Sequence, residues 1–374
     1  MSVTWIRDGA ALAALAEALR AGPALALDSE SDSLHHHVEK VCLLQLCGAD
    51  GRVALVDTLA LRDLSPLAPL MADPALVKVL HGADYDVTTL KRDFGFEFAG
   101  LFDTMIAARF LGRAQFGLQA LAAAELGVTL SKDSQTDDWS RRPLTPRQES
   151  YAADDVRHLL VLRERLEAAL LAAGRLDWVL EECAAVAALP AAERRRDAQA
   201  FLRLKGATKL ARRSLAVLRE AWAWREAQAE ESDIPSFKLV STEALLELAQ
   251  SPPASEAELR ARRGLSPRLK GRLGGLLEAV RRGQSVPPDQ WPEVPRSPRP
   301  VIPAEVQARV QRLRAWRQEE GARLALDISL VLPQRLIDKL AEAAPRSLDD
   351  LRRVEGLREW RCRTWGEALL QRCR

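Results

Sequence analysis

The sequence predicts an α/β domain, a mixed sheet flanked by helices, followed by two all-α helical domains. In the first half, short apolar runs alternate with longer segments of helical periodicity. Beyond Arg175 the pattern is helical, and from about residue 206 a block of sequence recurs 92 residues later. Seven prolines between the copies indicate a semi-rigid, non-helical linker. The predicted domains are residues 1–190, 206–283 and 304–374, with the linker at 284–303.

Composition indicates the class of protein to which the chain belongs. The 374 residues suffice for two or three domains, and 47% apolar and 28% charged residues are typical of a soluble globular protein. There is no run of 18 apolar residues and no secretory signal, so we expect no membrane association. Five cysteines without a CxxC pair favour a reducing, cytoplasmic setting over disulfides or zinc.

The charge is divided unevenly along the chain. Residues 1–190 carry 18 Lys and Arg against 27 Asp and Glu, a net charge of −9. Residues 191–374 carry 36 against 25, a net charge of +11. An acidic half joined to a basic half suggests a metal-dependent body with a polyanion-binding attachment. The alternative is a set of ordinary Arg-rich helices.

The elements expected in the first domain follow its apolar runs. A strand beginning at Trp5 leads into a helix that ends near Leu19, with Asp8 as its N-cap. Three strands joined by short turns come next and should pair antiparallel: residues 24–27, 41–46 and 53–56. Helices and strands then alternate: a helix at 64–71, a strand at 76–80, a helix from Asp84, a short strand into Asp103, and a helix from Pro146 to about Leu171.

The first candidate site lies where the apolar run Ala24–Leu27 gives way to Asp28 and Glu30. In extended chain these residues project their carboxylates from the same face. Two like charges so close are costly unless a positive charge lies between them. A divalent metal is the natural candidate, because hard cations bind carboxylate oxygen. The alternative is a strand that runs out into a solvated acidic loop, to which Asp32 would belong.

Two helices add further polar groups. Asp84 and Asp86 lie near a helix N-terminus, where Asp is favoured as a cap, and we expect Asp84 to be such a cap. In the helix from Pro146, Tyr151 and Asp155 are four residues apart and share a face. A Tyr and an Asp near the inner face of a core helix are costly unless they serve a site.

Together these stretches resemble the three motifs of the DEDDy class of 3′→5′ exonucleases: Asp28-Ser29-Glu30, His81–Asp86 and Tyr151–Asp155. Neighbouring segments are similar to bacterial ribonuclease D: Glu39–Gln45, Phe102–Thr104 and Trp139–Tyr151. The resemblance covers about residues 5–172 and implies a ribonuclease-H-like fold. It also implies that the metal-site carboxylates are Asp28, Glu30, Asp86 and Asp155, with Tyr151 the motif tyrosine. The loop His35–His37 matches no family pattern, and we favour substrate contact over metal binding for it.

The resemblance implies hydrolysis assisted by two divalent ions, Mg²⁺ or Mn²⁺. Such a reaction needs an in-line water, stabilisation of charge on the phosphate and help for the departing 3′ oxygen, and two ions can supply all three. We expect Asp28 to bridge them, with Glu30 and Asp155 completing the site of the ion that activates water. Asp86 would hold the second ion. Tyr151, whose ordinary pKa is about 10, would orient the water.

The repeated helical module resembles the helicase-and-RNase-D C-terminal (HRDC) domain, a small nucleic-acid-binding unit. Ala223-Trp224-Arg225 recurs as Ala315-Trp316-Arg317, and both tryptophans are expected in the core. The second copy has Asp327 where the first has Pro235, so it is the more diverged. Candidate phosphate contacts, with solvated helix faces as the alternative, are Arg194–Arg196, Arg212-Arg213, Arg262-Arg263 and Arg281-Arg282.

The sequence therefore predicts a metal-dependent 3′→5′ exoribonuclease that releases 5′-mononucleotides. The resemblance implies precursor tRNA and other structured RNA 3′ ends as substrates. One alternative is a DNA-directed 3′→5′ exonuclease acting on single-stranded DNA, because the metal site contacts only the scissile phosphate. A second is a nucleic-acid-binding protein with a vestigial site, and the intact carboxylates count against it. We expect a cytoplasmic protein without an obligate protein partner.

Overall fold

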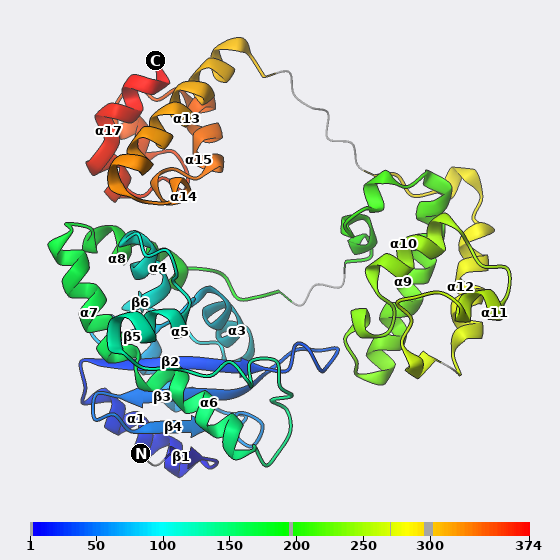
Figure 1. The fold of residues 1–374 in the computed structure, drawn as a ribbon, viewed down its shortest axis with the longest axis horizontal. Helices are drawn as coiled ribbons and strands as arrows, with labels where there is room; N and C mark the ends of the chain where they lie inside the picture. The colour runs from blue at the N-terminus through cyan, green and yellow to red at the C-terminus, as the bar shows by residue number, and fades with distance from the viewer. Residues whose placement is uncertain (1–2, 194–196, 270, 295–301) are drawn as a thin grey trace. The chain divides into compact units, whose positions relative to one another are not determined.

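The computed structural model describes residues 3–193, 197–269, 271–294 and 302–374. The chain forms two compact units. Unit 1 comprises Met1–Ser31, Val41–Ala192 and Pro300–Arg374, and unit 2 comprises Asp32–Lys40 and Glu193–Arg299. The predicted fold class, an α/β domain followed by two helical modules, is confirmed (Figure 1). Within the described ranges, none of the helices has both the length and the apolar character needed to cross a lipid bilayer.

A six-stranded mixed sheet in the order β1-β4-β3-β2-β5-β6 forms the centre of the α/β domain. As predicted, β2, β3 and β4 pair antiparallel. The outer strands pair in parallel: β1 with β4, β5 with β2, and β6 with β5. The strands are Val3–Ile6 (β1), Ala24–Ser31 (β2), Val41–Gly48 (β3), Val53–Val56 (β4), Val77–Leu80 (β5) and Leu101–Asp103 (β6).

Strand β2 differs from the prediction in its length. The apolar pattern predicts an end at Leu27, but β2 continues through the acidic residues to Ser31. Its partner β3 maintains the pairing, with Asp28 opposite Gln45 and Glu30 opposite Leu43, and an irregularity follows between Glu30 and Ser31. The acidic pair therefore lies within a central strand, where the backbone of both residues is held by the sheet.

The helices of the α/β domain mostly begin where predicted. Asp8 caps α1 (Gly9–Arg20) by accepting a hydrogen bond from the Ala11 N–H. The prediction of Asp84 as a cap is wrong: the N-cap of α3 (Asp84–Phe94) is Ala83, and Asp84 is an exposed residue of the first turn. The remaining α-helices described before residue 145 are α2 (Ala68–Ala72), α4 (Thr104–Phe110) and α5 (Leu118–Leu121).

The long helix expected from Pro146 is two helices, α6 (Pro146–Arg157) and α7 (Leu159–Ala172), separated at His158. Helix α8 (Leu176–Ala187) follows. Thr145 caps α6 in a capping box with Gln148, which fixes where this helix begins. Helix α6 packs on β2, β3 and β4 and crosses in front of the sheet in Figure 1.

One row of side chains crosses the face of the sheet beneath α6. The strand registers place Trp5, Leu55, Gln45 and Asp28 next to one another on β1, β4, β3 and β2. At one end of the row, the Trp5 Nε1–H donates to Glu149 Oε1 of α6 over 3.1 Å. Asp28 occupies the other end, so the row and α6 together position the candidate site.

The two helical modules repeat with an offset of 92 residues. Helix α9 (Arg212–Ser232) matches α13 (Ala304–Leu324), and α11 (Glu256–Arg260) matches α16 (Leu348–Arg352). The residues that end α9 and α13, Asp233 and Ala325, both adopt a left-handed conformation, with φ of 47° and 52°. The other helices are α10 (Thr242–Gln250), α12 (Leu273–Gln284), α14 (Ile328–Val331), α15 (Gln334–Ala343) and α17 (Glu359–Cys373). This correspondence confirms the internal duplication.

The modules differ in how their tryptophans are used. Trp316 is buried as predicted, whereas Trp224 is half-buried against its module's core. Within unit 1 the second module packs on α8: the rings of Trp178 and Trp360 stack with centroids 4.6 Å apart, and the Trp360 Nε1–H donates to Glu182.

Of the predicted linker, Pro288–Gln290 forms a 3₁₀ turn, and residues 295–301 lie outside the described residues.

Candidate active site

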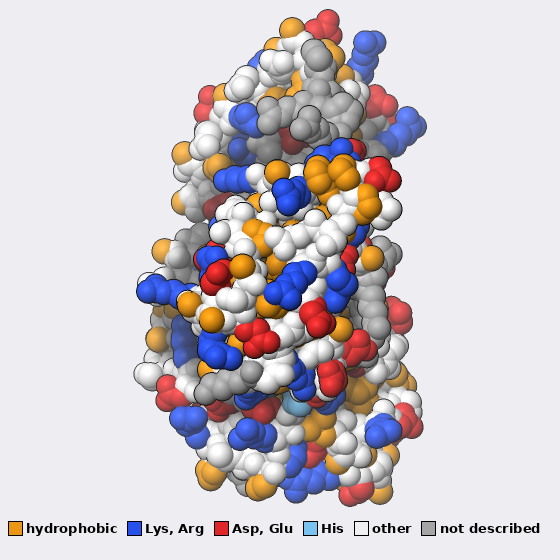
Figure 2. Space-filling model, turned by 90° about the vertical axis from the view of Figure 1, so that its right-hand side faces the viewer, with side chains coloured by type: hydrophobic (Ala, Val, Ile, Leu, Met, Phe, Trp, Pro, Cys, Tyr) orange, Lys and Arg blue, Asp and Glu red, His pale blue; other side chains and the backbone are white. Residues whose placement is uncertain are grey.

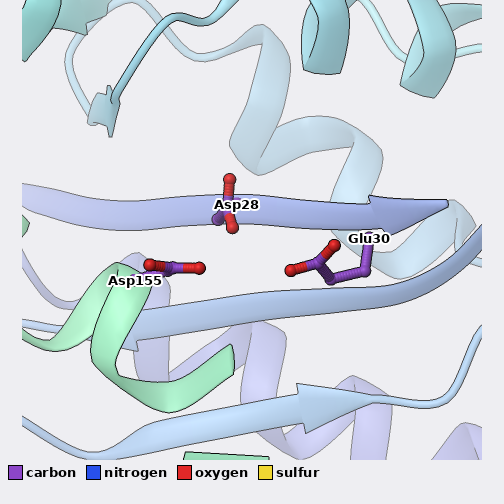
Figure 3. A group of neighbouring side chains, drawn as sticks. All are labelled: Asp28, Glu30 and Asp155. Atoms are coloured by element: carbon purple, nitrogen blue, oxygen red, sulfur yellow. The ribbon is translucent and has the colours of Figure 1, made fainter. Parts of the chain in front are cut away.

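Three carboxylates, two from β2 and one from α6, meet at the Asp28 end of the row of side chains beneath α6. Asp28 and Glu30 of β2 and Asp155 of α6 each offer an oxygen, and these oxygens all lie within 4.8 Å of one another. Figure 3 shows the three side chains gathered where α6 passes β2. The expectation that Asp28 and Glu30 share a face is confirmed by this grouping, and Asp155 reaches it from the facing helix.

The pKa values of the three carboxyl groups are raised, and a cation between them would favour their ionised forms. Burial, followed by the charge of Asp155, raises the pKa of Asp28 to about 8. Burial raises the pKa of Asp155 to about 7, and burial together with the neighbouring carboxylates raises the pKa of Glu30 well above its ordinary value. Like charges in a poorly solvated place disfavour ionisation, and a cation between them would relieve both costs. An all-oxygen donor set is the one that hard divalent ions prefer, so these residues fit such an ion.

Asp86 lies close to this cluster but outside the group of three. It is buried in α3, and the Ser29 Oγ–H donates to its Oδ1 over 2.5 Å. Burial, and after it the charge of Asp28, raises the pKa of Asp86 well above its ordinary value. The structure therefore brings Asp86 into electrostatic contact with the cluster without placing it among the same set of ligand atoms.

Tyr151 lies one turn before Asp155 on α6, and its hydroxyl interacts with the Asp155 carboxylate. Its ring packs against Trp139, with centroids 6.0 Å apart. Burial and the surrounding carboxylates raise the pKa of Tyr151 far above its ordinary value. The phenol therefore stays protonated at any physiological pH and can orient a hydrogen-bond acceptor, but it cannot serve as a base.

The histidine loop does not join the carboxylates. Among the described residues, no histidine belongs to the group that could hold a metal ion. The loop belongs to unit 2, where His36 Nδ1 lies 2.6 Å from Asp233 Oδ2 and the His37 N–H donates to Asp233 Oδ1. Asp154, one residue before Asp155, forms an ion pair with Arg157 instead of entering the site.

Sequence reasoning misses two polar residues beside the carboxylates, Ser29 and Gln45. In the sequence Ser29 is only the residue between two acids, because β2 is expected to end before it. Once β2 is known to continue, alternation places Ser29 on the opposite face, where it meets Asp86. Gln45 ends a segment that carries the family resemblance, but only the register with β3 shows that it lies opposite Asp28.

The raised pKa values predict that cation binding depends on pH. Asp28 and Asp155, with pKa values of about 8 and about 7, must lose protons to bind a cation. We therefore expect Mg²⁺ to bind more tightly as the pH rises from 6 to 9 and to release protons at pH 7. Titration calorimetry in two buffers with different ionisation enthalpies measures this release, and a pH-independent affinity without proton release would contradict it.

The same shifts act in the opposite direction on the cation-free protein. Between about pH 4 and pH 8 its folded state holds more protons on these carboxyls than the unfolded state does. Their contribution to stability is therefore complete below pH 4 and is lost as the pH rises to about 8. Thermal unfolding in EDTA should show this loss, and Mg²⁺ should raise the Tm most at high pH.

Comparison with known families identifies relatives of both parts of the chain. A family model described as 3′-5′ exonuclease matches residues 3–171, and the HRDC domain model matches residues 214–280 and again 306–373. Ribonuclease D of Pseudomonas paraeruginosa is 35% identical over 374 residues, covering 98% of this chain and 96% of its own. Ribonuclease D of Escherichia coli is 35% identical over 301 residues, covering 78% of each chain.

Two solved structures share the fold. The crystal structure of Escherichia coli RNase D, described as an exoribonuclease involved in structured RNA processing, aligns over 100% of this chain and 98% of its own, with a TM-score of 0.69 and 30% identity. The catalytic core of RRP6 from Trypanosoma brucei covers 76% of this chain and 81% of its own, with a TM-score of 0.68 and 28% identity.

Proposed function

Because the chain belongs to the ribonuclease D family and is a 3′→5′ exoribonuclease, we propose that it trims the 3′ ends of precursor tRNA and other structured RNAs with two divalent cations, Mg²⁺ or Mn²⁺. The observation that carries the cation proposal is the meeting of Asp28, Glu30 and Asp155 within 4.8 Å. We propose an exonuclease domain at 1–190, HRDC modules at 206–283 and 304–374, and a linker at 284–303. Five buried free cysteines fit a cytoplasmic enzyme.

Each site residue is proposed to have a distinct task. Divalent cations would supply the charge that lowers the pKa of the attacking water and offsets charge on the phosphate. Asp28, Glu30 and Asp155 would hold the cations through their oxygens, and Asp86, steadied by Ser29, would contribute from the other face of β2. Tyr151, kept protonated beside Asp155, would orient the nucleophile.

RNA is the proposed natural substrate, with single-stranded DNA as the competing ligand. The cations held by the carboxylates would contact the scissile phosphate, which RNA and DNA share, so this site gives no discrimination between them. Support for RNA comes from the ribonuclease D relatives and from the paired HRDC matches. Discrimination against DNA would require contacts to the 2′-hydroxyl of the terminal nucleotide.

One assay tests this proposal directly. RNA and DNA strands of one sequence, labelled at either end, are incubated with Mg²⁺, Mn²⁺ or EDTA. We expect stepwise shortening of 5′-labelled RNA, release of the labelled 3′ mononucleotide, dependence on the cation, and much slower loss of DNA. Equal or faster loss of DNA would favour the DNA-directed alternative, and no cleavage with either cation would favour a binding protein.

Single arginines of the first module are predicted to contact phosphate. Figure 2 shows basic and acidic side chains interspersed over one face of the described residues, so the candidates on that face are individual arginines. Arg212 and Arg262 pair with Glu293 and Glu247, while their neighbours Arg213 and Arg263 are exposed. The cluster Arg194–Arg196 lies outside the described residues.

The double variant Arg213→Gln, Arg263→Gln should bind single-stranded RNA more weakly. Removing one arginine that neutralises a phosphate should make the slope of log K against log salt shallower by roughly 0.7. Fluorescence anisotropy in EDTA over a series of salt concentrations measures the slope. The matched control is Arg212→Gln, Arg262→Gln, which removes arginines already engaged by carboxylates. Equal effects of the two double variants would contradict the assignment.

A further inference from the structure

We infer that Gln45 of β3 is a positioning residue of the active site, whose side-chain amide N–H donates a hydrogen bond to the Asp28 carboxylate in the cation-bound enzyme. This inference rests on the proposed function, because it assigns Gln45 to the same carboxylate site. Gln45 would not touch the substrate or the cation. It would act by fixing the direction in which Asp28 presents its oxygens.

The first observation is an unsatisfied amide. Gln45 has no exposed surface, and in the described part of the chain neither its Oε1 nor its Nε2 has a hydrogen-bond partner. Folded proteins rarely leave such groups unpaired, because a buried donor or acceptor without a partner destabilises the fold. An apolar side chain would serve packing better at this position in the sheet. The amide therefore calls for a hydrogen-bond partner.

The second observation is the set of side chains around it. On this face of the sheet Gln45 has four neighbours: Leu43 and Cys47 on its own strand, Leu55 on β4, and Asp28 on β2. The leucines offer no polar group, and the Cys47 thiol already donates to the Gly48 carbonyl. Of these four, Asp28 alone carries a strong acceptor.

The strand register brings Asp28 within reach of the Gln45 side chain. Side chains of directly opposed residues in an antiparallel pair have Cβ atoms about 5 Å apart, well within the reach of a glutamine amide. Asp28 and Gln45 are such a pair. Helix α6 packs on β2, β3 and β4 and Gln45 has no exposed surface, so the amide is enclosed next to its cross-strand neighbours Leu55 and Asp28.

This hydrogen bond would strengthen the binding of the cation. A carboxylate that binds a cation through one oxygen can accept a hydrogen bond through the other, and a bond to a charged acceptor is stronger than one between neutral groups. Residues that orient metal ligands in this way typically change metal affinity by about 10- to 100-fold when they are replaced. We assign that role to Gln45.

The test uses Gln45→Met in the full-length protein, since methionine retains the shape and loses the amide. Mn²⁺ binding without RNA is measured by calorimetry, together with the Tm in EDTA and kcat and KM for RNA. We expect Mn²⁺ to bind at least about 10-fold more weakly and kcat at limiting Mn²⁺ to fall. The Tm in EDTA should be unchanged or higher, because a buried unpaired amide has been removed. A purely structural role would not weaken Mn²⁺ binding.

Leu55→Met is the matched control, because Leu55 is equally buried in the same row and does not adjoin Asp28. It should bind Mn²⁺ like the wild type. If Gln45→Met also binds Mn²⁺ like the wild type, the inference is overturned and the proposed function stands. If Asp28→Asn binds Mn²⁺ as well as the wild type does, or the wild type does not bind Mn²⁺, the proposed cation site is wrong, and the inference about Gln45 is wrong with it.

Discussion

Replacement of Asp28 by Asn is expected to abolish hydrolysis, lowering kcat at least about 10³-fold, or about 4 kcal/mol of transition-state stabilisation. Asn has nearly the same shape but no charge with which to hold a cation between β2 and α6. Binding of RNA should remain close to that of the wild type, because the HRDC modules and their arginines are proposed to supply most of the affinity. Single-turnover cleavage with Mg²⁺ and fluorescence anisotropy in EDTA measure the two properties separately.

The matched control is Asp154→Asn, which removes a carboxylate from the same helix that carries Asp155. Asp154 pairs with Arg157 and does not belong to the cluster, so this variant should keep nearly all of its activity. In EDTA, Asp28→Asn should also be at least as stable as the wild type at pH 8, because a costly buried charge has been removed. A folded Asp28→Asn protein that loses cleavage and RNA binding to the same degree would refute the proposed division of labour.

Much of the α/β domain could be predicted because its signals are local. Asp8 and Thr145 cap helices through hydrogen bonds to residues three positions away, and the short turns between apolar runs specify antiparallel pairing. The length of β2 could not be predicted in this way. Asp28 to Ser31 are poor strand formers alone, and they are extended because β3 pairs with them.

The candidate site was predictable to the same extent. Alternation in an extended chain placed Asp28 and Glu30 on one face, and the four-residue spacing placed Tyr151 beside Asp155. How those two pairs meet depends on the packing of α6 across the sheet. Two neighbours of the carboxylates, Ser29 beside Asp86 and Gln45 opposite Asp28, are placed by strand pairing, and no local sequence pattern specifies that pairing.

The contrast between the two helical modules also lies outside what the sequence pattern can tell. Arg361 of the second module is equivalent by the 92-residue repeat to Leu269 of the first, which is an ordinary core residue. In the second module the arginine is buried and reaches Glu182 of α8, so one repeat position is an apolar core residue in the first module and a contact with α8 in the second. From sequence alone, an arginine there is indistinguishable from one on a solvated helix.

Arg361→Ala is therefore expected to destabilise unit 1 by about 3 kcal/mol or more. The guanidinium is 4% exposed, and it donates to the Leu330 and Val331 carbonyls as well as to Glu182. Removing it leaves the Leu330 and Val331 carbonyls without this donor, in addition to a cavity where the guanidinium packed on the Trp360 ring. Glu182 loses one partner but keeps the hydrogen bond from the Trp360 Nε1–H. Urea unfolding monitored by tryptophan fluorescence measures the loss, since Trp178 and Trp360 stack at this contact.

Arg363→Ala tests whether the stability contributed by Arg361 comes from its burial or only from its charge. Arg363 lies on the same helix α17 and pairs with Glu181 of α8, but its side chain is 53% exposed. Solvent screens such a pair, so its loss should cost less than about 1 kcal/mol. If the two variants lose equal stability, the contact is held by general charge attraction. If Arg361→Ala alone is strongly destabilised, the stability of unit 1 depends on a buried arginine that binds its own module and reaches Glu182 of α8 in the domain carrying the active site.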